Sequence, residues 1–253
     1  VLVATPGRLI DLINRGKVDL SEVRFLVLDE ADEMLNMGFQ EDIETILKDV
    51  PETRRTLLFS ATMPNEIAKI SRQYMHDAAE ISIGTRNAGS DNVEHIYYMV
   101  RADHRYLALK RIVDMNPDIY GIVFCRTRQE TKDVAEKLIK DGYNADALHG
   151  DLSQAQRDTV MNKFRIKNLQ VLVATDVAAR GLDVSDLTHV INYNLPDDVE
   201  VYTHRSGRTG RAGKKGVSCV IVHTREGRRL REIERIIKKE FKKKNKYVFG
   251  PYP

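Results

Sequence analysis

Two adjacent carboxylates, Asp29 and Glu30, directly follow the apolar run Phe25–Leu28. A short apolar run without alternation is typical of a strand that is buried on both faces of a parallel sheet. The two acids would then lie at the carboxyl end of this strand, where open α/β sheets bind their ligands. One carboxylate there can hold a hydrated Mg²⁺, and the other can orient or deprotonate a water molecule. Taken alone, the pattern also fits a strand end with solvated acids, so its interpretation depends on the rest of the chain.

A second group of reactive side chains lies between His204 and Arg211, where three arginines stand among glycines. Glycine lets the backbone turn tightly, and the planar guanidinium fork of arginine matches phosphate oxygens. The composition therefore suits phosphate binding, although a solvated loop or a simple RNA contact would have the same composition.

Alternating strands and helices would position these groups. The apolar runs predict strands at 1–4, 25–28, 56–62, 95–100, 122–125, 171–175, 190–193 and 217–222, with another leading to His149. The helices between them have predicted starts at Thr5-Pro6, at Pro64, at a capping box of Thr127 with Glu130, and at one of Ser153 with Gln156. The last helix would present Leu230, Ile233, Ile237 and Phe241 to the core. This alternation indicates parallel sheets with right-handed crossovers.

Length and composition favour two α/β domains that contain no membrane span. The 253 residues exceed one average domain, and 42% of them are hydrophobic, enough to build sizeable cores. No apolar run approaches the length of a membrane span, and no signal peptide is visible. Cys125 and Cys219 lie inside apolar runs, so we expect buried thiols and not a disulfide, which fits a reducing, cytoplasmic location. No Cys/His spacing indicates zinc.

The net charge of +3 hides a basic segment near the end of the chain. Residues 225–246 hold 11 Lys and Arg against 4 Glu, a net of +7. The apolar stripe of this segment predicts that it packs on the second domain as a helix. Its exposed lysines, 242–244 above all, would then add non-specific RNA affinity through counterion release.

Four motifs in this order resemble those of the DEAD-box RNA helicases: DEAD at 29–32, SAT at 60–62, ATDVAARGLD at 174–183 and HRSGRTGR at 204–211. The resemblance covers the chain from Val1 to about Lys244, and residues 226–234 look most like the bacterial DeaD type. It implies an α/β fold of two RecA-like parallel-sheet domains, the first one incomplete. Their expected bounds are 1–84 and 93–244, with a linker at 85–92 and a tail at 245–253.

The resemblance also implies ATP and Mg²⁺ as cofactors and RNA as the partner. Asp29 would match the acid that holds the metal, and Glu30 the residue that activates the hydrolytic water. Arg208 and Arg211 would match the arginine fingers that reach the γ-phosphate. Two further residues, Gly181 and Asp183, would belong to the nucleotide site, where Asp183 would match the acid near the ribose.

Two more sets of residues follow from the same resemblance. The residues that would couple domain closure to hydrolysis are Asp32, Ser60, Thr62 and His204. The residues that would contact the RNA sugar-phosphate backbone are Thr5, Arg8, Thr127, Gly150, Gln154, Arg157 and Thr175. Such contacts suit binding without sequence preference. Without the resemblance, Gln154 and Arg157 would be interpreted as a helix cap and a surface charge.

Most departures from the family pattern lie in the first domain; in the second, Gln129 stands where some relatives have a basic residue. The sequence contains no GxxxxGK[ST] phosphate-binding loop and no adenine-reading glutamine motif. We therefore expect residues to be missing before Val1, with exposed apolar surface and unpaired strand edges in 1–84, while 93–244 should fold alone. Two alternatives remain to an ATP-dependent RNA helicase core that is inactive by itself. One is a non-catalytic RNA-binding protein derived from a helicase, and the other is a helicase that acts on DNA.

Overall fold

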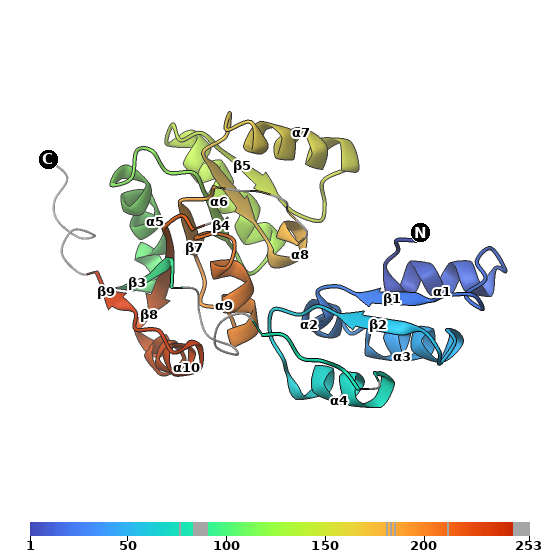
Figure 1. Ribbon diagram of the computed structural model, residues 1–253. Helices are drawn as coiled ribbons and strands as arrows, with labels where there is room; N and C mark the ends of the chain where they lie inside the picture. Colours follow the sequence, from blue (N-terminus) through green and yellow to red (C-terminus); the bar gives the residue numbers. More distant parts are fainter. Residues whose placement is uncertain are drawn as a thin grey trace, which may run out of the picture. The chain divides into compact units, whose positions relative to one another are not determined.

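The computed structural model describes residues 1–75, 77–82, 91–180, 182, 184, 186–211 and 213–244. The chain divides into two compact units, Val1–Asn87 and Ala88–Pro253, hereafter unit 1 and unit 2. Figure 1 colours unit 1 from blue to cyan and unit 2 from green to red. Most of the predicted linker (85–90) and the whole predicted tail (245–253) lie outside the described residues. Within the described ranges, no helix has both the length and the apolar character that crossing a membrane requires.

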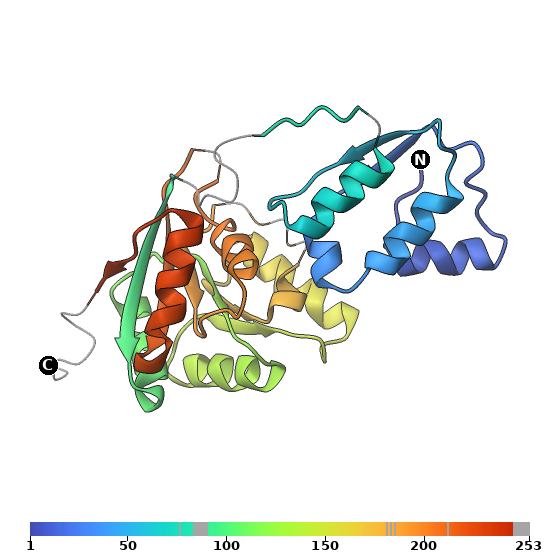
Figure 2. The ribbon, with the colours of Figure 1, turned by 90° about the horizontal axis from the view of Figure 1, so that it is seen from below.

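Unit 1 is built on a small parallel sheet. Its elements are α1 (Pro6–Asn14), β1 (Phe25–Leu28), α2 (Ala31–Asn36), α3 (Gln40–Asp49), β2 (Arg55–Leu58) and α4 (Asn65–Tyr74). Strand β1 pairs with β2 in parallel, and Phe25 lies opposite Arg55. The side chains of Leu28, Ile43, Leu47 and Ile70 form the buried core between this sheet and the helices. In Figure 2 the helices of unit 1 lie along one side of the two strands.

The prediction that β1 is buried on both faces is wrong. Leu28 is 8% exposed, but Phe25 and Val27 on the other face are 63% and 55% exposed. Leu57 and Phe59 are likewise exposed along and just after β2. The sheet therefore covers a core on one face only, and the other face presents apolar side chains, as the sequence predicts for this unit.

The start of the chain also differs from expectation. Residues 1–4 are not in a strand, because they pair with neither β1 nor β2, and Val1 and Val3 are exposed. A strand needs a neighbour to take up its backbone hydrogen bonds, so apolar composition alone does not create one. The helix start is as predicted, with Pro6 in the first turn of α1, although the Thr5 hydroxyl makes no capping hydrogen bond.

Unit 2 is a seven-stranded, all-parallel sheet in the order β5-β6-β4-β7-β8-β3-β9. The strands are β3 (Val93–Val100), β4 (Gly121–Phe124), β5 (Ala145–Leu148), β6 (Val171–Ala174), β7 (His189–Asn192), β8 (Gly216–His223) and β9 (Lys242–Lys243). The helices are α5 (Arg105–Asp114), α6 (Arg128–Lys140), α7 (Gln154–Arg165), α8 (Asp176–Ala179), α9 (Val199–Ser206) and α10 (Gly227–Ile237), with short 3-10 turns η1 (Ala102–His104) and η2 (Thr224–Glu226).

Helices cover both faces of this sheet (Figures 1 and 2). Alternate residues of the strands, such as Val123 and Val173, pack on one face against α5 and α6. Their neighbours pack on the other face, where Phe164 of α7 joins one cluster and Tyr202 of α9 joins another together with α10. Strands β4 and β6 are buried at every position, as their continuous apolar runs predict.

The two cysteines are buried and free, as the sequence predicts. Cys125 follows β4 and Cys219 lies in β8, and burial raises the pKa of both thiols. A protonated, inaccessible thiol has little nucleophilic reactivity, so these residues serve packing.

The end of the basic segment is not helical as expected. Helix α10 ends at Ile237 because Lys238 adopts a left-handed backbone conformation with φ of 54°. The chain then turns back, Phe241 is buried outside the helix, and Lys242–Lys243 form strand β9. This strand pairs with β3 at the sheet edge, with Lys242 opposite Ile96.

Candidate active-site and RNA-contact residues

In unit 1 the paired acids lie where the apolar run predicts, at the carboxyl end of β1. Asp29 and Glu30 are both exposed, and the backbone N–H of Glu30 donates to Oδ1 of Asp29 at 3.0 Å. Glu30 caps α2 in a left-handed conformation with φ of 51°. Such a conformation costs a residue with a Cβ roughly 1–2 kcal/mol. Local backbone strain therefore coincides with a predicted catalytic residue.

A buried hydrogen-bond network connects the first two motifs of unit 1. Asp32 is 1% exposed, and its Oδ2 accepts from the Thr62 backbone N–H at 2.7 Å and from the Thr62 hydroxyl at 2.6 Å. The Ser60 hydroxyl donates to the Thr62 carbonyl at 2.6 Å and accepts from the Asp32 N–H at 3.3 Å. Three of the four predicted coupling residues are thus brought together. The fourth, His204, lies in α9 of unit 2.

In unit 2, three predicted RNA contacts follow the ends of adjacent strands. Thr127, Gly150 and Thr175 come after β4, β5 and β6, which are neighbours in the sheet order β5-β6-β4. Because the strands are parallel, all three residues lie at one edge of the sheet. Each threonine caps a helix: the Thr127 hydroxyl accepts from the Glu130 N–H at 3.1 Å, and that of Thr175 accepts from the Ala178 N–H at 3.3 Å.

Only one of the two predicted capping boxes is complete. Ser153 and Gln156 exchange both hydrogen bonds at the start of α7. At α6 the Glu130 carboxylate instead accepts from the Arg126 N–H at 3.1 Å and from the Asn194 side chain at 3.0 Å. The Glu130 carboxylate therefore accepts from other donors and not from the Thr127 N–H that a capping box requires.

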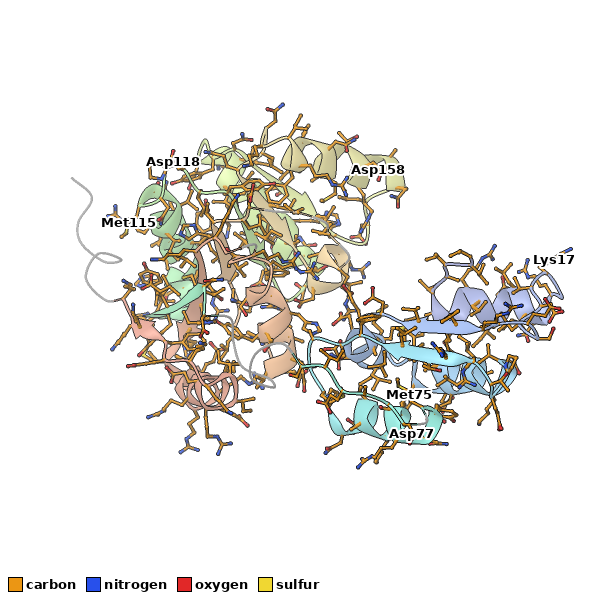
Figure 3. All side chains as sticks on the ribbon, viewed as in Figure 1. Lys17, Met75, Asp77, Met115, Asp118 and Asp158 are labelled. Atoms are coloured by element: carbon orange, nitrogen blue, oxygen red, sulfur yellow. The ribbon has the colours of Figure 1, made fainter. Side chains whose placement is uncertain are left out.

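Helix α7 brings two more predicted RNA contacts to the same edge. The Gln154 side chain donates to Asp158 at 2.8 Å, and Figure 3 labels Asp158 on α7. Arg157 donates to the Ala178 carbonyl at 3.4 Å and so connects α7 to α8. Five of the seven predicted RNA contacts therefore gather in unit 2. The other two, Thr5 and Arg8, lie at the start of α1 in unit 1, where Arg8 pairs with Asp11 at 2.7 Å.

The two predicted arginine fingers lie after α9 beside a small basic cavity. The Arg208 guanidinium donates to the Leu182 carbonyl at 3.3 Å, and Arg211 donates to the Gly207 carbonyl at 2.7 Å. The cavity has a volume of about 90 Å³. Its lining includes four cationic side chains and one carboxylate: Arg208, Arg211, Lys214, Lys215 and Asp186. Gly181 and Asp183, predicted to bind the nucleotide, lie outside the described residues.

A buried ion pair that the sequence motifs did not single out connects these regions. Arg205, 4% exposed, contacts Asp176 through two bonds of 2.6 and 2.7 Å. It also donates to the Asn192 side chain at 3.0 Å and to the Asn194 carbonyl at 3.2 Å. Arg205 lies near the end of α9, three residues before Arg208, and Asp176 directly follows Thr175. The pair therefore links the segment that carries the two predicted arginine fingers to a predicted RNA contact.

A second cluster missed from the sequence surrounds Gly150. Asp151 pairs with Arg128 at 2.6 Å and with Lys132 at 2.9 Å. The hydrogen bond from Lys132 is the main cause that lowers the pKa of Asp151. Burial is the main cause that lowers the pKa of the adjacent His149, which favours its neutral form. The position of Arg128 beside Thr127 was the available signal, but its partner is 23 residues away and only the fold brings the two together.

The fold and these sites define a class before any comparison is made. A parallel sheet with helices on both faces, and with hydroxyl, glycine and arginine groups beyond its strand ends, is the arrangement of α/β proteins that bind phosphate-bearing ligands.

Comparisons with known proteins identify the family. Residues 1–70 match the DEAD/DEAH box helicase model, and residues 104–213 match the helicase conserved C-terminal domain. The DEAD-box ATP-dependent RNA helicase CshA of Bacillus cereus is 48% identical over 240 residues, which are 95% of this chain and 46% of that protein. The chain belongs to the DEAD-box RNA helicase family. It spans about half the length of the curated relatives that it matches.

Solved structures agree with this assignment. S. cerevisiae Dbp5 bound to RNA and ADP BeF3 is 29% identical, with a TM-score of 0.87, and the match covers 96% of this chain and 65% of that one. E. coli SrmB, solved with the regulator of ribonuclease activity A, is 33% identical with a TM-score of 0.57, and the match covers 60% of this chain and 90% of that one. The predicted α/β class with RecA-like parallel sheets is confirmed.

Proposed function

We propose that the chain is part of an ATP-dependent RNA helicase that couples ATP hydrolysis to local unwinding of an RNA duplex. Unit 1 supplies the two acids after β1, and unit 2 supplies the two arginines and most of the RNA contacts. The observation that best supports the proposal is the gathering of Thr127, Gly150 and Thr175 beyond three adjacent strands, with Arg157 beside them. Hydroxyl, backbone and guanidinium groups at one edge suit a sugar-phosphate backbone.

Asp29 fits a Mg²⁺ site of the kind that uses a single carboxylate. It is exposed, and one of its oxygens accepts the Glu30 N–H, which leaves the other oxygen available. The described residues contain no cluster of three or more His, Cys, Asp or Glu side chains that could hold an ion, so a site here would keep most of its ligands as water and phosphate oxygens. A bound Mg²⁺ would neutralise phosphate charge. Glu30 would orient and deprotonate the attacking water, and Arg208 and Arg211 would stabilise the charge that develops on the γ-phosphate.

The 253 residues by themselves should not turn over ATP. They contain no glycine-rich loop ending in GK[ST], which supplies the backbone N–H groups and the lysine around the phosphates. This absence also keeps open a second candidate function, a non-catalytic RNA-binding protein. The free, buried thiols favour a reducing cytoplasm for either function.

RNA binding tests what the two candidates share. Fluorescence anisotropy of the 253-residue chain with labelled single-stranded RNA should show binding that depends little on sequence. Thr175→Val and Arg157→Gln should each weaken it, whereas Lys17→Gln should not, because exposed Lys17 lies outside every predicted contact (labelled in Figure 3). Equal affinity for a DNA strand of the same sequence would favour a DNA helicase, since the 2′-OH is what distinguishes RNA.

Hydrolysis separates the two candidates in a longer chain that also carries a phosphate-binding loop. There, RNA-stimulated ATPase activity is expected, and Arg208→Lys should lower turnover by up to ~10³-fold while nucleotide binding changes less. Lysine keeps the charge and loses the planar fork, so the variant tests geometry. Normal turnover in the Arg208→Lys, Arg211→Lys double variant would remove both residues from the mechanism.

A further inference from the structure

Helix α10 carries a stripe of arginines on the face directed away from the core. Its buried face consists of Leu230, Ile233 and Ile237, which pack with α9 and β8. Arg228, Arg231 and Arg235 follow the spacing i, i+3, i+7, which places them on one side of a helix, and all three are exposed. They span about 10 Å along the helix axis. We call these three residues the arginine stripe.

The arginine stripe gathers, on one helix face, cationic side chains of this segment that no described carboxylate neutralises. No described carboxylate forms an ion pair with any of its guanidinium groups, and the one recorded side-chain bond is from Arg231 to the Gly227 carbonyl at 3.3 Å. Some other cations of the segment are paired: Arg229 contacts Asp197 at 2.6 Å, and Lys242 contacts Glu94 at 3.1 Å. Lys239 pairs with Asp91. Outside the stripe, four more cations form no ion pair with a described carboxylate but do not share one helix face: Arg225, Lys238, Lys243 and Lys244. Glu232 is the acid of α10 exposed beside the stripe, and three cations outnumber it.

We propose that the arginine stripe is a second phosphate-contacting surface, which binds RNA beyond the segment held at the ends of β4, β5 and β6. The inference rests on the proposed function. Three guanidinium forks on one solvent-facing side match phosphate oxygens and can engage them without breaking an existing ion pair. Neutralising phosphates at such a surface releases counterions, which is the main source of sequence-independent affinity.

The stripe must contact a different part of the RNA from the strand-end residues. Helix α10 packs on β8, which is two strand positions from β4 and four from β5 in the sheet order. At the usual spacing between strands these separations are about 10 and 19 Å. In Figures 1 and 2, α7 and α10 lie at opposite ends of unit 2. An oligonucleotide just long enough to cover the ends of β4, β5 and β6 would therefore leave the stripe free, whereas a longer RNA would reach both surfaces.

The test measures how the RNA affinity of the 253-residue chain depends on RNA length and on salt concentration. The variant Arg228→Gln, Arg231→Gln, Arg235→Gln should bind an RNA of about 30 nucleotides on the order of 10-fold more weakly at low salt, and its slope of log affinity against log salt should be shallower by about 2. Its affinity for an oligonucleotide of about 6 nucleotides should be unchanged. The matched control is the triple variant Lys17→Gln, Lys48→Gln, Lys69→Gln, which removes the same charge from exposed positions in unit 1. It should change neither the affinity for the two RNAs nor the salt slope.

Each other outcome gives a definite answer. If the stripe variant binds the long RNA as the control does, the stripe is no RNA surface, while binding by the unchanged chain leaves the proposed function intact. If the variant loses affinity equally for both lengths, the stripe is not a separate surface. If the unchanged chain binds neither RNA, the proposed function itself fails. Because the three side chains point to solvent, an unchanged thermal midpoint should show that the variant is folded.

Discussion

Both units are built from alternating strands and helices, but their sheets differ in the number of strands and in how far the helices cover them. Unit 2 buries both faces of a seven-stranded sheet, and its central strands have no exposed residue. Unit 1 has two strands, and Phe25 and Val27 on its open face are more than half exposed. Both units nevertheless place predicted site residues at strand ends. A strand end can therefore take its local geometry from one turn and one neighbouring strand, while stability depends on how much of the sheet is covered.

The strongest test of this contrast is limited proteolysis. Unit 1 covers one face of a two-stranded sheet, so it should open more often than unit 2 and be cleaved first. We expect a stable fragment that begins near Asn92, identified by mass spectrometry. Simultaneous degradation of both units, or a fragment derived from unit 1, would show that exposed apolar surface does not set their relative stability.

The next largest effect is expected from the buried ion pair of unit 2. Arg205→Met leaves Asp176 without its partner in a largely buried network, so the free energy of unfolding of unit 2 should fall by roughly 3–5 kcal/mol. The matched change in unit 1 is Arg8→Met, where the pair with Asp11 is exposed and worth about 1 kcal/mol or less. Urea denaturation, with hydrogen exchange as the probe that reports on each unit separately, would measure the loss of unfolding free energy in both variants. Equal losses would contradict the difference in burial.

Acid should destabilise unit 2 through His95. This side chain is 3% exposed, its Nδ1 lies 2.5 Å from the Tyr202 hydroxyl, and burial followed by the charge of Lys239 lowers its pKa to about 4. The unfolded chain binds a proton at higher pH than the folded one. The contribution of His95 to the free energy of unfolding is therefore complete above about pH 6.5. It falls by up to about 3 kcal/mol as the pH drops to about 4, and then levels off.

His95→Gln separates this contribution from those of other groups. Glutamine can still bond to Tyr202 but does not titrate, so hydrogen exchange in β3 and β8 should depend less on pH between 4 and 6.5. Burial also lowers the pKa of His149 and His189 in the same unit, so part of the dependence should remain. An unchanged pH profile would mean that His95 titrates normally.

The smallest effect is expected on the open face of unit 1. Phe25→Thr and Val27→Thr change side chains that are 63% and 55% exposed, so stability should shift by no more than about 0.5 kcal/mol. Aggregation measured by light scattering should decrease, because an exposed apolar face promotes association. Leu28→Thr, on the buried face, should instead cost about 2 kcal/mol or more. A large loss from the first two changes would show that this face is packed.

Local patterns along the sequence predicted much of this structure. Alternating apolar runs and cap residues located the strands of unit 2, the complete capping box at Ser153, and the acids after β1. Patterns of this kind depend on neighbours along the chain. Properties set by distant partners were missed: residues 1–4 pair with no strand, and β9 forms along the edge that β3 offers. The left-handed backbone of Lys238, which ends α10 early, is local but left no sign in the apolar spacing.

The same limit applies to the candidate site. Motif spacing identified Asp32 and Thr62, which do meet, because each comes four residues after the end of one of two paired strands. It gave no weight to Arg205, although its bonds to Asp176 and Asn192 connect parts of the chain that are 29 and 13 residues apart. A charged residue within a motif has the same letter whether it is buried or solvated. Only the fold distinguishes a positioning residue from one that meets the ligand.

The strained backbone at Glu30 has an evolutionary consequence. Glycine adopts a left-handed conformation at little steric cost, and asparagine tolerates it better than glutamate does. Glu30→Gly should therefore raise the denaturation midpoint of unit 1 while removing the carboxylate that hydrolysis would need. A descendant of this chain that no longer needed hydrolysis could exchange Glu30 for glycine without loss of activity, because the stabilising substitution would then cost no function. In the proposed helicase, glutamate at position 30 keeps the carboxylate at the expense of local stability.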